Sequence, residues 1–129
     1  MGALNNIIVM NRGDSYSFDL TISGADTQDG RYRLIEDDAV YFGIMDPGQR
    51  FEDALVRKKY TAEDCDEMGN LVIDIDPDDT INLYPGKYFY AIKLLMDHDD
   101  FNPNTGEKTG KRVDKVVTVI NKTKFIICD

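Results

Sequence analysis

Apolar and polar residues alternate along most of the chain, and a period of two is that of a β-strand with one buried face. The clearest example runs from Asp14 to Ile22, where every second residue is apolar. Comparable runs predict further strands. With the first, they give about seven strands, at Ile7–Met10, Asp14–Ile22, Ala39–Met45, Leu55–Tyr60, Leu71–Asp76, Lys87–Met96 and Val117–Ile127.

Turn-forming residues separate these runs. Pro85-Gly86 suits a type II turn, because proline presets the first central residue and glycine accepts a positive φ at the second. One helical turn is predicted at Thr61–Cys65, where Thr61 can cap the first amides. No stretch predicts a helix of three turns.

Short strands at intervals of roughly 12–18 residues, separated by turns, predict an all-β fold. We expect an immunoglobulin-like antiparallel β-sandwich that forms a single domain over residues 1–129. The two longest connections, Ser23–Asp37 and Asp97–Arg112, are polar and are predicted to be loops.

Two tyrosines share one face of the predicted strand that follows Pro85-Gly86. In immunoglobulin-like sandwiches a tyrosine at this corner buries its ring and bonds its hydroxyl back to the chain. Either Tyr88 or Tyr90 can fill that place. We therefore assign Pro85, Gly86, Tyr88 and Tyr90 a structural role rather than a binding role.

The charge of the chain narrows the possible partners. Its 129 residues include 15 Lys and Arg against 24 Asp and Glu, a net charge of −9. Such a balance opposes nucleic-acid binding, which depends on basic residues displacing counterions from phosphates. No apolar run approaches the roughly 18 residues of a membrane span. Neither nucleic acid nor membrane is expected as a partner.

Few residues favour catalysis or a cofactor. The single histidine, His98, lies in a polar stretch, and no nucleophile motif surrounds any Ser or Cys, so His98 is interpreted as a solvated loop residue. One histidine and two distant cysteines form no familiar zinc set. Cys65 and Cys128 are expected to be free thiols, with a single bridge between them as the alternative. We predict no enzyme activity and no cofactor.

Acidic loops leave a weak candidate for calcium, which prefers oxygen ligands. Its residues are Asp97, Asp99, Asp100 and Asn102, and a solvated acidic loop is the simpler interpretation, so no metal site is assigned. A carbohydrate-binding or calcium-dependent adhesion module remains the alternative function. The aromatic residues nominated for it are Tyr32, Tyr41 and Tyr60.

Three consecutive basic residues, Arg57, Lys58 and Lys59, stand out in an acidic chain. They suggest contact with an acidic partner, since complementary charge sets the orientation and rate of association. The alternative is that lysines protect an edge strand from pairing with other chains.

The order of these segments resembles that of small structural proteins of tailed bacteriophages and prophages. The layout is similar to the immunoglobulin-like N-terminal domain of the phage baseplate upper protein. The segments that carry the resemblance are VYFGIMDP (40–47), FEDALVRKKYT (51–61), GNLVIDIDPDDT (69–80), LYPGKYFYAIKL (83–94) and VVTVINKTKFII (116–127).

The resemblance implies a non-enzymatic component of a tail or baseplate, a head–tail joint or a capsid decoration. Its partners would be other virion proteins or copies of itself in a homo-oligomer. Its location would be the virion, and the host bacterial cytoplasm before assembly. The sequence reaches Asp129 without the receptor-binding or coiled-coil segment of the long baseplate proteins, so we expect a stand-alone module.

Overall fold

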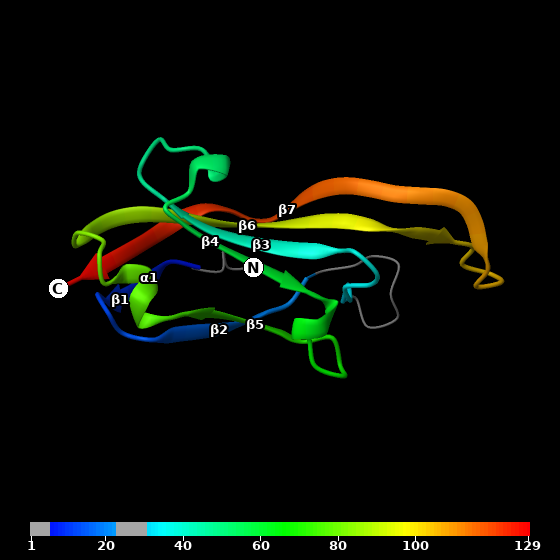
Figure 1. Cartoon of the computed structure of the whole chain (residues 1–129), viewed down its shortest axis with the longest axis horizontal. Coiled ribbons are helices and arrows are strands. Elements are labelled where there is room, and N and C mark those ends of the chain that lie inside the picture. Colours follow the sequence, from blue (N-terminus) through cyan, green and yellow to red (C-terminus); the bar gives the residue numbers. More distant parts are fainter. Residues whose placement is uncertain (1–5, 23–30) are drawn as a thin grey trace.

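A computed structural model describes residues 6–22 and 31–129 of the chain. In these residues it confirms an all-β fold with seven strands (Figure 1). The strands are β1 (Ile8–Asn11), β2 (Tyr16–Leu20), β3 (Ala39–Met45), β4 (Val56–Thr61), β5 (Leu71–Ile75), β6 (Gly86–Phe101) and β7 (Lys108–Cys128). The helical turns are η1 (Phe51–Asp53), η2 (Ala62–Asp64) and α1 (Pro77–Thr80).

The strands form two layers of unequal size (Figure 1). The larger sheet has the order β1-β7-β6-β3-β4, and the smaller pairs β2 with β5. The β7-β6-β3-β4 order, facing a sheet that holds β2 and β5, is that of immunoglobulin-like sandwiches. All pairs are antiparallel except β1 with β7, which is parallel, so the larger sheet is mixed.

The core is formed by the alternating apolar residues of the predicted strands. Val40, Phe42 and Ile44 are fully buried on one face of β3, and Ile73 and Ile75 face them from β5. Burial of such side chains contributes about 1.5–3 kcal/mol each relative to exposure. The two layers are therefore joined mainly by apolar contact.

Three rings join the sheets near their centre. Phe18 on β2 lies 6.5 Å from Phe42 on β3 and 6.4 Å from Tyr90 on β6, measured between ring centroids. Many immunoglobulin domains join the sheets here with a disulfide packed against a tryptophan. In this chain Cys65 and Cys128 are both free, and aromatic rings occupy the join.

The tight turns of the chain are only partly as predicted. The helical turn expected at Thr61–Cys65 is η2, and the Thr61 amide donates to the Asp64 carboxylate at 2.8 Å. Gly86, in contrast, has φ of +153° and opens β6, so it lacks the φ near +80° that a type II turn requires at that residue.

The predicted loop at Asp97–Arg112 is wrong. Residues 97–101 continue β6 and residues 108–112 begin β7, so the two strands form a long hairpin. Its tip extends beyond the two layers as an arm, at the right of Figure 1. The other predicted loop, Ser23–Asp37, lies partly outside the described residues.

Candidate interaction surfaces

The three predicted contact residues on β4 do not share one face. Lys58 turns toward the interior, where its Nζ lies 3.2 Å from Asp76 and 2.8 Å from Asp79. Burial alone would lower the pKa of Lys58, but these two carboxylates raise it above its ordinary value. Lys58 is thus engaged within the chain, whereas Arg57 and Lys59 are exposed on the outer side of the larger sheet.

Strand register places more basic residues on this same outer side. Lys59 is paired with Tyr41, Tyr41 with Lys93, and Phe89 with Lys124, so their side chains project together. No carboxylate of the described residues lies within 4 Å of the basic groups here, in contrast to Lys58. We call this surface the basic face; its members are Arg57, Lys59, Lys87, Lys93, Lys122 and Lys124.

Aromatic rings and a backbone carbonyl, rather than acids, contact these cations. Lys93 Nζ lies 5.0 Å from the centroid of Phe51, and Lys59 Nζ lies 6.0 Å from that of Tyr41. Lys122 donates to the carbonyl of Gln49 at 2.7 Å. Exposed cation–π contacts contribute only about 0.5–1 kcal/mol. The basic face therefore keeps its positive charge available to an anionic partner.

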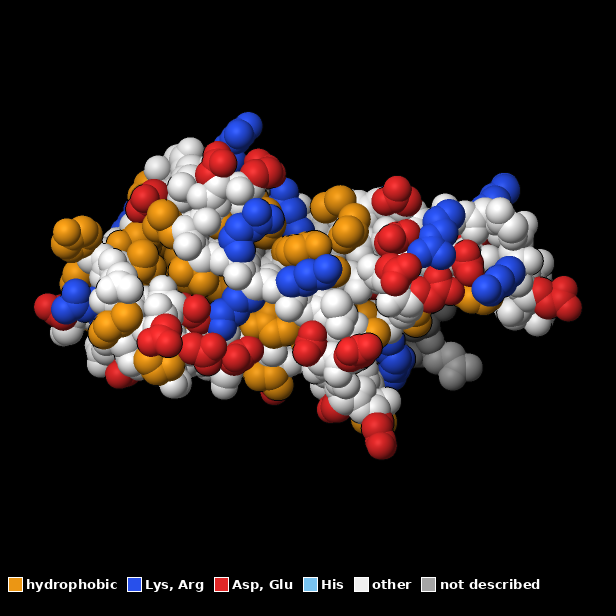
Figure 2. All heavy atoms as spheres, in the orientation of Figure 1, with side chains coloured by type: hydrophobic (Ala, Val, Ile, Leu, Met, Phe, Trp, Pro, Cys, Tyr) orange, Lys and Arg blue, Asp and Glu red, His pale blue; other side chains and the backbone are white. Residues whose placement is uncertain are grey.

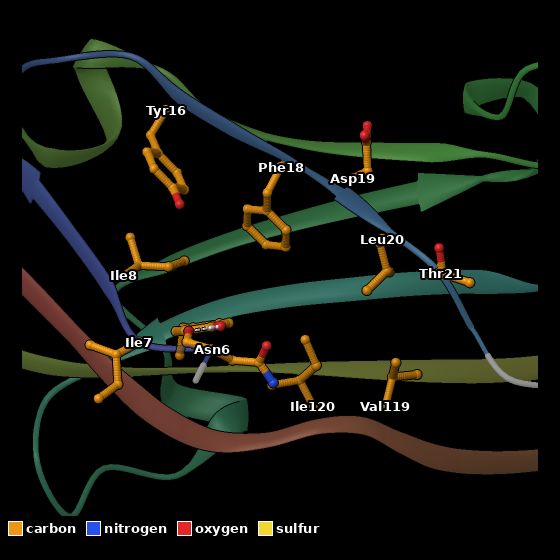
Figure 3. Close-up of a pocket in the computed structure, with 11 residues that line it drawn as sticks. Asn6, Ile7, Ile8, Tyr16, Phe18, Asp19, Leu20, Thr21, Val119 and Ile120 are labelled. Carbon is orange, nitrogen blue, oxygen red and sulfur yellow. Dashed lines mark hydrogen bonds between the residues drawn. The ribbon is translucent and has the colours of Figure 1, made fainter. Parts of the chain in front are cut away.

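An open cleft lies between the two layers beside β2 (Figure 3). Tyr16, Phe18 and Leu20 point from β2 into the cleft, toward Val119 and Ile120 on β7, as Figure 3 shows. Its volume is about 470 Å³. Within the described part of the chain β2 pairs only with β5, so its other backbone edge is uncovered. Apolar side chains and the polar residues Asn6, Asp19 and Thr21 line the cleft together, and it is open to solvent.

The four calcium candidates lie on or next to the arm, where cations and a hydroxyl already use their oxygens. Arg112 contacts the carboxylates of Asp97 and Asp99 at 3.0 and 3.1 Å, and Thr109 donates to Asp100 at 2.9 Å. The Asn102 side chain accepts from the amide of Asn104. No group of three or more His, Cys, Asp or Glu side chains in residues 6–22 and 31–129 could hold a metal ion.

His98 is not a solvated loop residue. Its side chain is only 12% exposed, and its Nδ1 lies 2.8 Å from Oδ1 of the fully buried Asp38. The hydroxyl of Tyr32 donates to the other oxygen of Asp38. Burial alone would raise the pKa of Asp38, but these bonds and two backbone amides hold it below its ordinary value. Sequence reasoning missed this cluster.

The cluster has part of the arrangement that hydrolases use. Asp38 orients the ring of His98, as a carboxylate does in a catalytic triad. A triad also needs a nucleophile at the second ring nitrogen. Within the described residues, no serine or cysteine hydrogen-bonds His98. The geometry is that of a cross-link between the start of β3 and β6.

The two corner tyrosines both bond back to the main chain. Tyr88 is buried and its hydroxyl donates to the carbonyl of Tyr84 at 2.6 Å, four residues upstream. Tyr90 donates instead to the carbonyl of Asn6, which precedes β1. Tyr88 thus has the local bond typical of this corner, with exposed Pro85 and Gly86 just before it.

The aromatic residues nominated for carbohydrate binding do not form a row. Tyr60 is 8% exposed on the inner side of β4 and bonds Asp74, while Tyr41 lies on the outer side of β3. Tyr32 bonds Asp38. A flat sugar-binding surface needs such rings side by side, and these three point to different surroundings.

Comparisons with known proteins add no assignment. No protein-family model, curated protein or solved structure matches the chain. None of the helices in the described residues has the length and apolar character required to cross a membrane.

Proposed function

We propose that this chain is a non-enzymatic structural protein that works through protein–protein contacts, as a component of a tailed phage or prophage particle. The observation that supports the contact role is the basic face. A chain of net charge −9 collects six cations on one sheet surface and gives them no acidic partner among its described residues.

The distribution of ion pairs strengthens this argument. On the arm, Lys108 and Arg112 are each matched by carboxylates at 2.9–3.2 Å, although the exposed Lys111 and Lys115 are not matched by any described residue, and Lys58 is matched on the inner side of β4. The chain has enough acid to neutralise every cation, yet Lys59 and Lys93 have none. A protein surface with exposed carboxylates would supply the missing partners, with charge setting its orientation.

Strand geometry suits such docking. The outer side of the larger sheet also carries Val116, which is 61% exposed, and half-buried Leu95 and Tyr41. Protein interfaces combine aromatic or aliphatic anchors with charged groups at their margins.

The test is affinity capture of the tagged chain from cells that carry its native genome, with prophage induced. We expect structural proteins with acidic surfaces, or copies of the chain, to be captured by wild type and lost with K59Q/K93Q. The matched control is K111Q/K115Q, which removes the same charge from exposed lysines on the arm.

Particles from the same culture test the phage assignment separately. We expect the chain to co-purify with tail or capsid proteins through a density gradient in a fixed ratio. Absence of the chain from purified particles contradicts the phage role. Capture that does not differ between K59Q/K93Q and K111Q/K115Q contradicts a contact role for the basic face.

A further inference from the structure

The outer surface of the smaller sheet has the opposite charge to the basic face. Register places Asp19 and Asp74 on the outside of β2 and β5, because Phe18 and Ile73 point inward. Figure 3 shows Asp19 directed away from the cleft. The two outer surfaces of the sandwich therefore carry opposite charge.

A shallow hollow of about 530 Å³ lies on this acidic side. Three carboxylates line it, with Arg31 as the one cation, which bonds Asn70. We call this surface the acidic face; its members are Asp19, Asp64, Asp66 and Asp74. Figure 2 shows acidic side chains along the lower border, on the side of the smaller sheet, and basic ones across the middle of the view.

We propose that the chain assembles with itself head to tail, the basic face of one copy docking on the acidic face of the next. This inference rests on the proposed function and names the partner of the same surface. Charge complementarity carries it: Asp19 and Asp64 have no ion pair within 4 Å among the described residues, and neither do Lys59 and Lys93.

Geometry sets the form of the assembly. The two faces lie on opposite sides of the sandwich, so a copy that uses one keeps the other free. Such a heterologous contact does not close on itself in a dimer, and it produces a ring or an open stack. Electrostatic contacts between exposed charges weaken with salt, since the Debye length falls from about 10 Å at 0.1 M to about 3 Å at 1 M.

The experiment is sedimentation velocity over a range of protein and NaCl concentrations. We expect wild type to form species larger than a dimer at low salt, with association weakened about tenfold or more at 0.5 M NaCl. The variants neutralise one face each: K59Q/K93Q and D19N/D64N. Asparagine at 64 keeps an oxygen for the Thr61 amide that Asp64 now accepts.

Each variant alone is expected to be monomeric, and an equimolar mixture is expected to stop at a one-to-one dimer. In that mixture one intact basic face meets one intact acidic face, and both outer ends are blocked. The controls K111Q/K115Q and E107Q/D114N change the same charges on the arm and are expected to associate like wild type. Near-UV circular dichroism checks that every variant is folded.

Four outcomes overturn the inference. Wild type that stays monomeric shows that copies are not the partner, and the proposed function then depends on its own capture experiment. Association of either face variant at wild-type strength, or a mixture that stays monomeric, removes the head-to-tail contact. A duplex oligonucleotide that binds wild type but not K59Q/K93Q would assign the basic face to nucleic acid instead.

Discussion

Substitution of Asp38 tests how much its buried hydrogen bonds contribute to the stability of the fold. Asp38 is fully buried and accepts bonds from the amides of Ile35 and Asp97, at 3.2 and 2.7 Å, as well as from Tyr32 and His98. Asp38→Ala removes all four acceptor contacts. A buried donor left without an acceptor costs about 1–3 kcal/mol.

The expected loss follows from which donors can reach water. Tyr32 and His98 are partly exposed and can form hydrogen bonds with water instead, so most of the loss in stability comes from the two backbone amides. Both amides are only partly buried, which places each near the lower end of the range. We expect Asp38→Ala to lower the free energy of unfolding by about 2–3 kcal/mol, and Asp38→Asn by about half as much, because the amide keeps one oxygen.

Urea unfolding followed by circular dichroism measures this, with the slope m unchanged between variants. The control is the neighbouring Asp37→Ala, whose side chain is 77% exposed and pairs with Arg112 at the surface. The reasoning fails if Asp38→Ala unfolds at the wild-type urea concentration, or costs no more than Asp37→Ala.

The contribution of Asp38 to the free energy of unfolding should also depend on pH, in a definite direction. The pKa of Asp38 is lower in the folded chain than its ordinary value of 3.8, so the ionised carboxylate stabilises the fold. The stability difference between wild type and Asp38→Asn should be fully present at pH 5, above the ordinary pKa of the carboxyl. It should shrink as pH falls below 3.8, through the folded pKa. A difference that grows on acidification contradicts this assignment.

Two further substitutions test local geometry. Tyr88→Phe deletes the hydrogen bond from the Tyr88 hydroxyl to Tyr84 and should lower the free energy of unfolding in urea by about 0.5–1.5 kcal/mol. An unchanged free energy of unfolding would show that this bond does not stabilise the fold. Gly69→Ala should lower the melting temperature more than Gly106→Ala. Both glycines have a positive φ, but only at Gly69 would the new Cβ lie 2.6 Å from Arg33 Cγ. Equal melting temperatures of the two variants would contradict this.

The strands could be predicted because their faces differ in burial. On β5, Leu71, Ile73 and Ile75 are buried while Val72 is 48% exposed, and this contrast is what the alternation in the sequence records. Residues 97–101 and 108–112 carry no such contrast. Except at His98, which contacts the buried Asp38, neither face of the hairpin is buried on the arm, so the pattern offers too little from which to predict a strand.

The candidate site could be predicted only in part. Lys58 was predicted to contact a partner together with Arg57 and Lys59, although its shared parity with Val56 and Tyr60 indicates the inner side of β4. The Asp38–His98 contact has no comparable pattern. It depends on the pairing of β3 with β6 across about 60 residues, which brings two polar positions together only after the sheet has formed.

The three rings that join the sheets have a practical consequence. Because Phe18, Phe42 and Tyr90 lie where many immunoglobulin domains have a disulfide, the contact between the two sheets needs no oxidant to form. Dithiothreitol should leave the melting temperature unchanged. The contact between the two sheets therefore places no redox requirement on folding.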